Sequence, residues 1–245
     1  MSLVDRRHYL PLPSQAYAYE DAPQALGAEF AGATISAPHM HAAALEHLAP
    51  ALGVAGEGGE GGDVGAGADG GRGRRVLDVG SGSGYLTHAF AALGGERCTV
   101  VGVDHLPSLV ALAKANMSRS ADGRRRLAEG QVRFVLGDGR RGYVDPLVVQ
   151  DDADEAADGD GEQGGWDVIH VGAAAAEVHP ELLRQLRRGG RMFIPVVDEK
   201  GGGAGGTQTV WLYQKDAQGK VRGVRIMGVR YVPLTDQPRE EHLGG

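Results

Sequence analysis

A glycine-rich loop and three aspartates sit at the ends of three short apolar runs. Gly80-Ser81-Gly82-Ser83-Gly84 follows residues 75–79, which include Asp78. Asp104 ends the next apolar run, and Asp138 follows the third. Glycines let a backbone approach a ligand with no Cβ in the way. An acid after the second strand can accept hydrogen bonds from both hydroxyls of a ribose, and an acid after the third can accept from an adenine amino group. This pattern indicates a ligand that carries a nucleoside.

The spacing of the glycines separates two kinds of nucleoside ligand. A dinucleotide site has the pattern Gly-x-Gly-x-x-Gly, with a pyrophosphate at the start of the following helix. Here the spacing is Gly80-x-Gly82-x-Gly84, and Asp78 precedes it by two residues, which suits a cationic amino group. S-adenosylmethionine has an ammonium, a carboxylate, a ribose and an adenine, so we predict it as the cofactor. An NAD site, or an acidic strand end with a tight turn, remains an alternative.

Alternating strand and helix signals predict the fold that positions these residues. The predicted strands are 75–79, 98–103, 131–136, 166–171 and 191–197. The predicted helices are 85–93, 109–119 and 181–187, the last closed by Gly189-Gly190 as a C-terminal stop. This order predicts an α/β fold with a doubly wound, mainly parallel Rossmann-like sheet, covered on both faces. Residues 209–214 and 221–232, joined by 216–219, predict antiparallel edge strands at the C-terminal end.

We expect one domain over residues 1–245, with two disordered insertions. Residues 53–71 are about half glycine, and residues 150–165 hold seven acids but no Lys or Arg. Removing those seven from the 32 acids of the chain leaves 25, equal to the 25 Lys and Arg. A second acidic segment, with Glu57, Glu60, Asp63 and Asp69, lowers the remainder to 21 acids against 25 Lys and Arg. The acidity therefore comes from two predicted loops and says little about the rest of the surface. The rest shows no basic stripe with interleaved aromatics, which argues against a nucleic-acid partner.

Composition also bears on where the chain works. No apolar run approaches the roughly 20 residues that a membrane span needs, and residues 1–10 lack a secretory signal. The lone cysteine, Cys98, excludes an internal disulfide and fits a reducing compartment. We expect a cytoplasmic monomer that binds neither membrane nor nucleic acid.

Several segments together resemble one enzyme family. Residues 76–87 (VLDVGSGSGYLT) resemble the first motif of the protein-L-isoaspartate (D-aspartate) O-methyltransferases, a motif that many methyltransferases share. Residues 34–42 (TISAPHMHA) and 231–236 (YVPLTD) resemble more specific segments of that family. Further matches lie in order at 102–105, 137–140 and 169–174.

The resemblance implies a repair activity and assigns site residues. The family moves a methyl group from S-adenosylmethionine to the free α-carboxylate of L-isoaspartyl and D-aspartyl residues in damaged proteins and peptides. Ser36 is expected to orient that carboxylate as a hydrogen-bond donor. The substrate groove is expected to include Ala37, Pro38, His39 and Val232. The cofactor-binding residues are expected to be Asp78, Gly80, Gly82, Asp104, His105, Asp138, Gly139 and Thr235.

This chemistry asks little of side chains, because a carboxylate is already anionic and nucleophilic at pH 7. It mainly needs in-line alignment and removal of water. Ser36 could instead cap a helix. His39, His41 and His47 with Glu46 could suggest a metal site, although we expect none. A methyltransferase for another substrate, and a binding module without activity, also remain possible readings.

Three departures from the family pattern bear on activity. Helices that usually precede the segment matching Asp5–Leu10 are expected to be missing here. The segment 28–32 is slightly longer than usual, and the tail after Thr235 is short. We expect the missing helices to weaken cofactor binding or stability.

Overall fold

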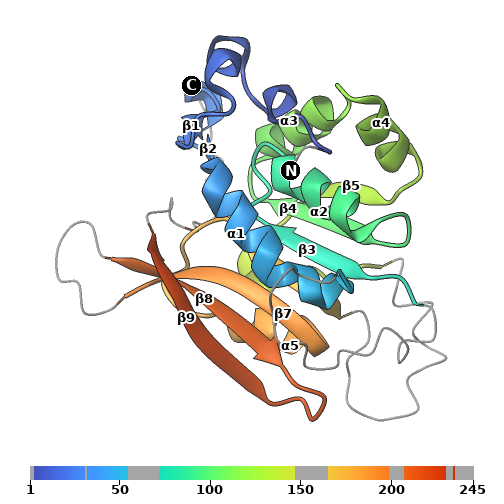
Figure 1. The fold of residues 1–245 in the computed structure, drawn as a ribbon, viewed down its shortest axis with the longest axis vertical. Coiled ribbons are helices and arrows are strands. Elements are labelled where there is room, and N and C mark those ends of the chain that lie inside the picture. The colour runs from blue at the N-terminus through green and yellow to red at the C-terminus, as the bar shows by residue number, and fades with distance from the viewer. Residues whose placement is uncertain are drawn as a thin grey trace, which may run out of the picture.

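A seven-stranded sheet forms the centre of the computed structural model, which describes residues 3–30, 32–54, 72–146, 165–198, 207–229 and 234 (Figure 1). The strand order is β5-β4-β3-β6-β7-β8-β9. Strands β3 to β7 run parallel to one another, whereas β8 is antiparallel to β7 and β9 is antiparallel to β8 at one edge. The strands span Arg75–Val79 (β3), Thr99–Asp104 (β4), Val132–Leu136 (β5), Trp166–Val171 (β6), Leu186–Val197 (β7), Gln208–Lys215 (β8) and Val221–Val229 (β9).

Within the described ranges, five α-helices and several short 3-10 turns surround this sheet. The helices are α1 (Pro38–Leu48), α2 (Tyr85–Gly94), α3 (Pro107–Met117), α4 (Ala121–Ala128) and α5 (Pro180–Gln185). The 3-10 turns are η1 (Arg6–Tyr9), η2 (Leu12–Tyr17), η3 (Ala28–Phe30), η4 (Ala49–Leu52) and η5 (Gly139–Arg141). A second, two-stranded sheet pairs β1 (Gln24–Ala25) with β2 (Thr34–Ile35). Helices α1, α3 and α5 begin at a proline, whose fixed φ suits the first helical turn.

The two faces of the sheet pack into two separate hydrophobic clusters. Every residue of β3 and β6 is buried, as expected for parallel strands covered on both faces. Side chains alternate along β3, so Val76 joins the cluster under α1, α2 and α3. Leu77 joins the opposite cluster, which contains Leu182 of α5 and Leu186. The predicted doubly wound α/β sheet is therefore confirmed.

The predicted end of the helix before the last parallel strand is wrong. The helix expected over 181–187, with Gly189-Gly190 as its stop, ends at Gln185, and β7 begins at Leu186. The pairing of β6 with β7 shifts here from Trp166↔Leu186 to Val168↔Arg191. The two glycines lie in this irregularity, and Gly189 has a φ of +78°. Gly189 and Gly190 therefore form an irregularity within a strand and do not end a helix. Glycine is common at both kinds of position.

The antiparallel C-terminal edge is confirmed as far as the structure describes it. Gly219, with a φ of +82°, donates from its N–H to the Asp216 carbonyl oxygen at 3.0 Å and closes the β8–β9 turn. Residues 230–232 of the predicted last strand lie outside the described residues. So do the predicted insertions 53–71 and 150–165, apart from Gly53, Val54 and Gly165. No helix in the described part of the chain is long and apolar enough to span a bilayer.

Candidate active site

The glycine loop, residues 80–84, lies at the carboxyl end of β3. Gly80, Gly82 and Gly84 have φ angles of +73°, +51° and +84°, which residues with a side chain rarely adopt. The Val103 carbonyl oxygen accepts from the N–H groups of Gly80 and Ser81 at 2.8 and 3.1 Å. The loop thus lies between β4 and β6, the two neighbours of β3. The chain continues from β3 to β4 on one side and later returns to β6 on the other side. Ligands bind at such a switch point in doubly wound sheets.

Asp104 closes one side of the loop. Its Oδ2 accepts from the Gly82 N–H at 2.9 Å, and its Oδ1 accepts from the Leu106 N–H at 3.2 Å. The His105 Nδ1 lies 3.3 Å from the same Oδ1. Oδ2 still has a second acceptor direction, because Gly82 is its one hydrogen-bond donor among the described residues. Asp104 can therefore hold the loop and accept from a ligand hydroxyl at the same time.

Asp78 lies beneath the loop and is only 1% exposed. The Thr87 hydroxyl donates to its Oδ2 at 2.5 Å, and the His170 Nδ1 lies 2.8 Å from its Oδ1. A buried carboxylate needs such partners. His170 is therefore a buried histidine whose ring has a hydrogen-bond partner. The direct contact of Asp78 with a cofactor ammonium stays a prediction.

Asp138 and Gly139 bring a third strand end to the same edge. Asp138 caps η5 by accepting from the Arg140 N–H at 3.1 Å, and it also pairs with the Arg140 guanidinium. These hydrogen bonds from Arg140 lower the pKa of Asp138. A Cβ on Gly139 would lie 2.2 Å from the Val79 Cγ1, so only glycine lets η5 approach β3 this closely.

Residues 34–39, the predicted substrate loop (called the substrate loop below), lie against the glycine loop. The Cβ position of Gly82 is 4.0 Å from the Thr34 carbonyl oxygen. Ser36 is half-buried, and its hydroxyl makes no hydrogen bond with the described residues. The helix-cap interpretation of Ser36 is wrong, because Ala37 is the N-cap residue of α1 and no side chain caps that helix. The hydroxyl thus remains available as a donor beside the glycine loop.

The three histidines once considered for a metal each have a different partner. The His39 Nδ1 lies 2.8 Å from the Asp21 Oδ1, on the exposed side of α1. The His41 ring lies against Arg6, and the His47 ring stacks on Phe193 at 6.0 Å. Within the described ranges, no group of three or more His, Cys, Asp or Glu could hold a metal ion.

Sequence reasoning missed Arg6 and a buried chain of hydrogen bonds beside it. The Arg6 Nη2 donates to the Ser36 carbonyl oxygen at 2.6 Å. The Tyr9 hydroxyl lies 2.5 Å from the His88 Nδ1, and the His88 Nε2 lies 2.8 Å from the Asp122 Oδ2. These partners are 30 to 79 residues apart, so no local spacing indicates them.

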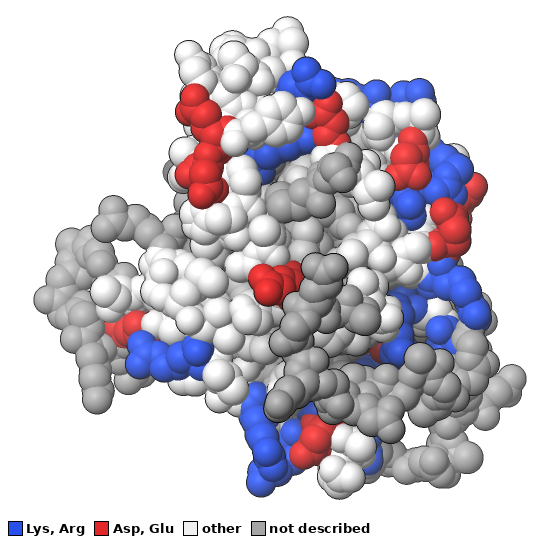
Figure 2. All heavy atoms as spheres, viewed as in Figure 1, with Lys and Arg blue, Asp and Glu red and all other residues white. Residues whose placement is uncertain are grey.

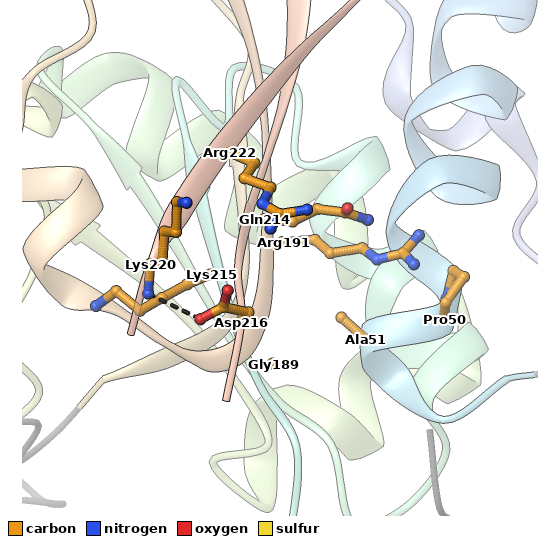
Figure 3. Close-up of a pocket in the computed structure, with 9 residues that line it drawn as sticks. All are labelled: Pro50, Ala51, Gly189, Arg191, Gln214, Lys215, Asp216, Lys220 and Arg222. Atoms are coloured by element: carbon orange, nitrogen blue, oxygen red, sulfur yellow. Dashed lines mark hydrogen bonds between the residues drawn. The ribbon is translucent and has the colours of Figure 1, made fainter. Parts of the chain in front are cut away.

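A cavity of about 280 Å³ lies at the opposite edge of the sheet (Figure 3). Its walls come from η4, from the beginnings of β7 and β9 and from the end of β8. The lining residues are Pro50, Ala51, Gly189, Arg191, Gln214, Lys215, Asp216, Lys220 and Arg222. None of the predicted site residues lines this cavity. The glycine loop lies at the carboxyl ends of the parallel strands, so the cavity is a separate feature.

Comparisons with known proteins agree with the resemblance seen in the sequence. The profile of the family "Protein-L-isoaspartate(D-aspartate) O-methyltransferase (PCMT)" matches residues 1–70, 71–147 and 148–239. Protein-L-isoaspartate O-methyltransferase 2 of Arabidopsis thaliana is 38% identical over 247 residues, covering 100% of this chain and 63% of that protein. The protein-L-isoaspartate O-methyltransferase of Caenorhabditis elegans is 38% identical over 241 residues, covering 98% of this chain and 84% of the relative.

A solved structure supports the same assignment. A protein-L-isoaspartate O-methyltransferase structure from Plasmodium falciparum, in complex with S-adenosyl-L-homocysteine, matches with a TM-score of 0.68 at 26% identity. The match covers 95% of this chain and 86% of that one. The predicted family is therefore confirmed: the chain belongs to the protein-L-isoaspartate(D-aspartate) O-methyltransferase family.

Proposed function

We propose that this chain transfers the methyl group of S-adenosylmethionine to the free α-carboxylate of isoaspartyl residues in proteins and peptides. Its family supports this activity, and the related Plasmodium structure carries S-adenosyl-L-homocysteine, the demethylated product of that cofactor. The observation that carries the proposal is the contact between the two loops. A Cβ placed on Gly82 would lie 4.0 Å from the Thr34 carbonyl oxygen. A methyl donor bound at the glycine loop and a carboxylate bound at the substrate loop would therefore be neighbours.

The residues present fit the cofactor. Three glycines with positive φ give a stretch of backbone that a ligand can approach closely, and Gly139 brings η5 near it. Asp104 would accept from the ribose hydroxyls, and Asp138 would accept from the adenine amino group. His105 lies beside Asp104 and would border the ribose. The bound cofactor supplies an electrophilic methyl group on a sulfonium with a good leaving group.

The chain's own task is then to align and dehydrate a carboxylate. The carboxylate is the nucleophile, and it needs no general base. No described histidine makes a hydrogen bond with the Ser36 hydroxyl, so Ser36 has no base beside it that would make it a nucleophile instead. The Ser36 hydroxyl would donate to one carboxylate oxygen, leaving the other oxygen to attack the methyl carbon. Ala37, Pro38 and His39 would border the peptide substrate.

Other parts of the proposal rest on the sequence alone. Val232 and Thr235, assigned to substrate and cofactor by resemblance, lie outside the described residues. A single domain over 1–245, a monomeric state and a cytoplasmic location also belong to the proposal. Figure 2 shows the basic side chains of one face in separate groups between acidic and neutral ones. This distribution favours a peptide substrate over a nucleic acid.

Paired peptides test the proposed activity. The chain is incubated with methyl-labelled S-adenosylmethionine and with two peptides that differ only in having isoaspartate or aspartate at one position. We expect label in the isoaspartyl peptide and none in the aspartyl peptide, because only isoaspartate, whose backbone runs through the side-chain carbon, has a free α-carboxylate there. Equal labelling of the two peptides, or no labelling of either, would contradict the proposal.

A further inference from the structure

Arg6 connects the start of the chain to the substrate loop. It lies in η1 and is only 3% exposed. Its Nη2 donates to the Ser36 carbonyl oxygen at 2.6 Å, and its Nη1 donates to the His41 Nδ1 at 3.0 Å. Its guanidinium also lies over the Tyr85 ring, 5.4 Å from the ring centroid. One buried side chain thus contacts the substrate loop, helix α1 and helix α2 at once.

The buried guanidinium of Arg6 lacks the ion pair that usually accompanies a buried charge, as far as the described residues show. No carboxylate in the described part of the chain lies within ion-pair distance of it, and its buried Nε has no hydrogen-bond partner. Burial lowers the pKa of its guanidinium. Its neighbour Arg7, in contrast, is exposed and pairs with Asp5 at 2.8 Å. A buried cation with no carboxylate among its described neighbours is costly, so stability alone does not explain why Arg6 lies under the substrate loop.

The contact with the Ser36 carbonyl fixes the orientation of the next peptide bond. The chain has no cis peptide bond among the described residues, and in a trans peptide the C=O and the following N–H point in opposite directions. Because the Ser36 carbonyl points to Arg6, the Ala37 N–H points away from it. That N–H makes no hydrogen bond with the described residues. The Ser36 hydroxyl and the Ala37 N–H are therefore two donors that have no partner among the described residues.

We propose that Arg6 is a positioning residue for methyl transfer: it fixes the Ser36–Ala37 peptide so that these two donors can hold the substrate carboxylate. The inference rests on the proposed function of the substrate loop. The fork of the guanidinium is essential to this role, because it reaches Ser36 and His41 simultaneously. The His41 Nδ1 must accept, so its proton lies on Nε2 and the ring is neutral. Burial and the nearby Arg6 charge lower the pKa of His41, which keeps the ring in that form.

Arg6→Met and Arg6→Lys test this role. Methionine keeps an apolar stem but removes both donors, whereas lysine keeps the charge but lacks the fork. We expect Arg6→Met to lower kcat/KM for an isoaspartyl peptide roughly ten- to hundredfold, since displacing a substrate-holding group costs about that much. We expect Arg6→Lys to recover only part of the loss. The affinity for S-adenosyl-L-homocysteine should change less than about twofold in both variants, because the glycine loop does not contact Arg6.

Arg7→Met is the matched control. It makes the same substitution one residue away and changes the net charge equally, but Arg7 is exposed and contacts neither Ser36 nor His41. Its kcat/KM should stay within about twofold of the wild-type value. An unchanged kcat/KM in Arg6→Met would overturn the positioning role. So would an equal loss of kcat/KM and of affinity for S-adenosyl-L-homocysteine in that variant.

Hydrogen exchange gives a readout that does not depend on activity. Amide exchange in residues 34–40 should become faster in Arg6→Met, and exchange in residues 80–84 should not change. If the wild-type chain fails to methylate isoaspartyl peptides, the proposed function fails, yet this exchange pattern still decides whether Arg6 holds the loop. Unchanged exchange in residues 34–40 would contradict the inference even if methylation is observed.

Discussion

The glycine loop and the substrate loop lie side by side but are held in different ways. The glycine loop is fixed by positive φ angles and by acceptors at the end of the neighbouring strand, Val103 and Asp104. The substrate loop is fixed by side chains from distant segments, namely Arg6 on its carbonyl and Asp21 on His39. The first arrangement follows from local backbone rules. The second needs the N-terminal segment to pack correctly before the loop can be ordered.

This difference predicts different responses to substitution. Changes in the glycine loop should affect folding, because its conformation and the start of α2 depend on each other. Changes in the substrate loop should affect turnover while leaving stability and cofactor affinity almost intact. Three predictions test the contrast, beginning with the largest expected effect.

Gly84→Ala should destabilise the protein most. Gly84 has a φ of +84°, and a Cβ there would meet the Ala113 Cβ and the Phe134 Cζ at 3.0 Å. The left-handed conformation costs about 1–2 kcal/mol for a residue with a side chain, and overpacking adds about 1–3 kcal/mol. We expect a loss of about 2–5 kcal/mol in the free energy of unfolding, measured by urea denaturation.

Gly53→Ala provides the control for that measurement. Gly53 has a similar left-handed conformation, with φ +75° and ψ 16°, but no atom lies within 4 Å of its Cβ position. It should lose only about 1–2 kcal/mol. Equal losses in the two variants would show that packing beneath the glycine loop does not constrain it.

Ser36→Ala should have a smaller effect, confined to the reaction. A hydrogen bond to a charged group contributes about 1.5–3 kcal/mol, so kcat/KM for an isoaspartyl peptide should fall roughly ten- to hundredfold. The free energy of unfolding should change by less than about 0.5 kcal/mol, because the hydroxyl has no hydrogen-bond partner among the described residues. A large fall in the affinity for S-adenosyl-L-homocysteine, measured by calorimetry, would instead assign Ser36 to the cofactor-binding residues.

Acid should weaken the structure around the substrate loop through His41. Burial lowers the pKa of His41 well below its usual 6.5, and Arg6, His170 and His39 also oppose its protonation. The unfolded chain therefore binds a proton below pH 6.5 that the folded chain does not. Stability should fall as pH drops below 6.5, by about 1.4 kcal/mol per pH unit from this group.

His41→Gln tests that contribution because glutamine cannot titrate. Between pH 7.5 and 5.5, the wild type should lose about 1.4 kcal/mol more unfolding free energy than the variant. Parallel losses in the two proteins would place the acid sensitivity elsewhere. His88 is a second source, since burial lowers its pKa as well.

The parts that follow local rules could be predicted from the sequence. The spacing of Gly80, Gly82 and Gly84 indicates a loop of unusual backbone angles, and all three have positive φ. Apolar runs bounded by turns predicted the parallel strands, because full burial demands such runs. The three aspartates do gather at one edge, since the carboxyl ends of parallel strands lie together.

The parts that depend on tertiary contacts could not be predicted. Gly189-Gly190 has the composition of a helix stop, yet pairing with β6 draws those residues into an irregular strand. Arg6 gives no signal in the sequence, because its partners Ser36 and His41 lie 30 and 35 residues away. Its burial, with no carboxylate of the described residues at ion-pair distance, is visible only once the fold is known.

Amide chemical shifts measured during two successive titrations most directly test whether the glycine loop binds the cofactor and the substrate loop binds the peptide. Adding S-adenosyl-L-homocysteine to the labelled protein should shift the amides of Gly80, Gly82 and Leu106. Adding an isoaspartyl peptide to that complex should then shift the amides of residues 34–39, and the matched aspartyl peptide should shift them much less. If the peptide leaves residues 34–39 unchanged, or if the product leaves the glycine loop unchanged, the assignment of cofactor and substrate to these two loops is contradicted.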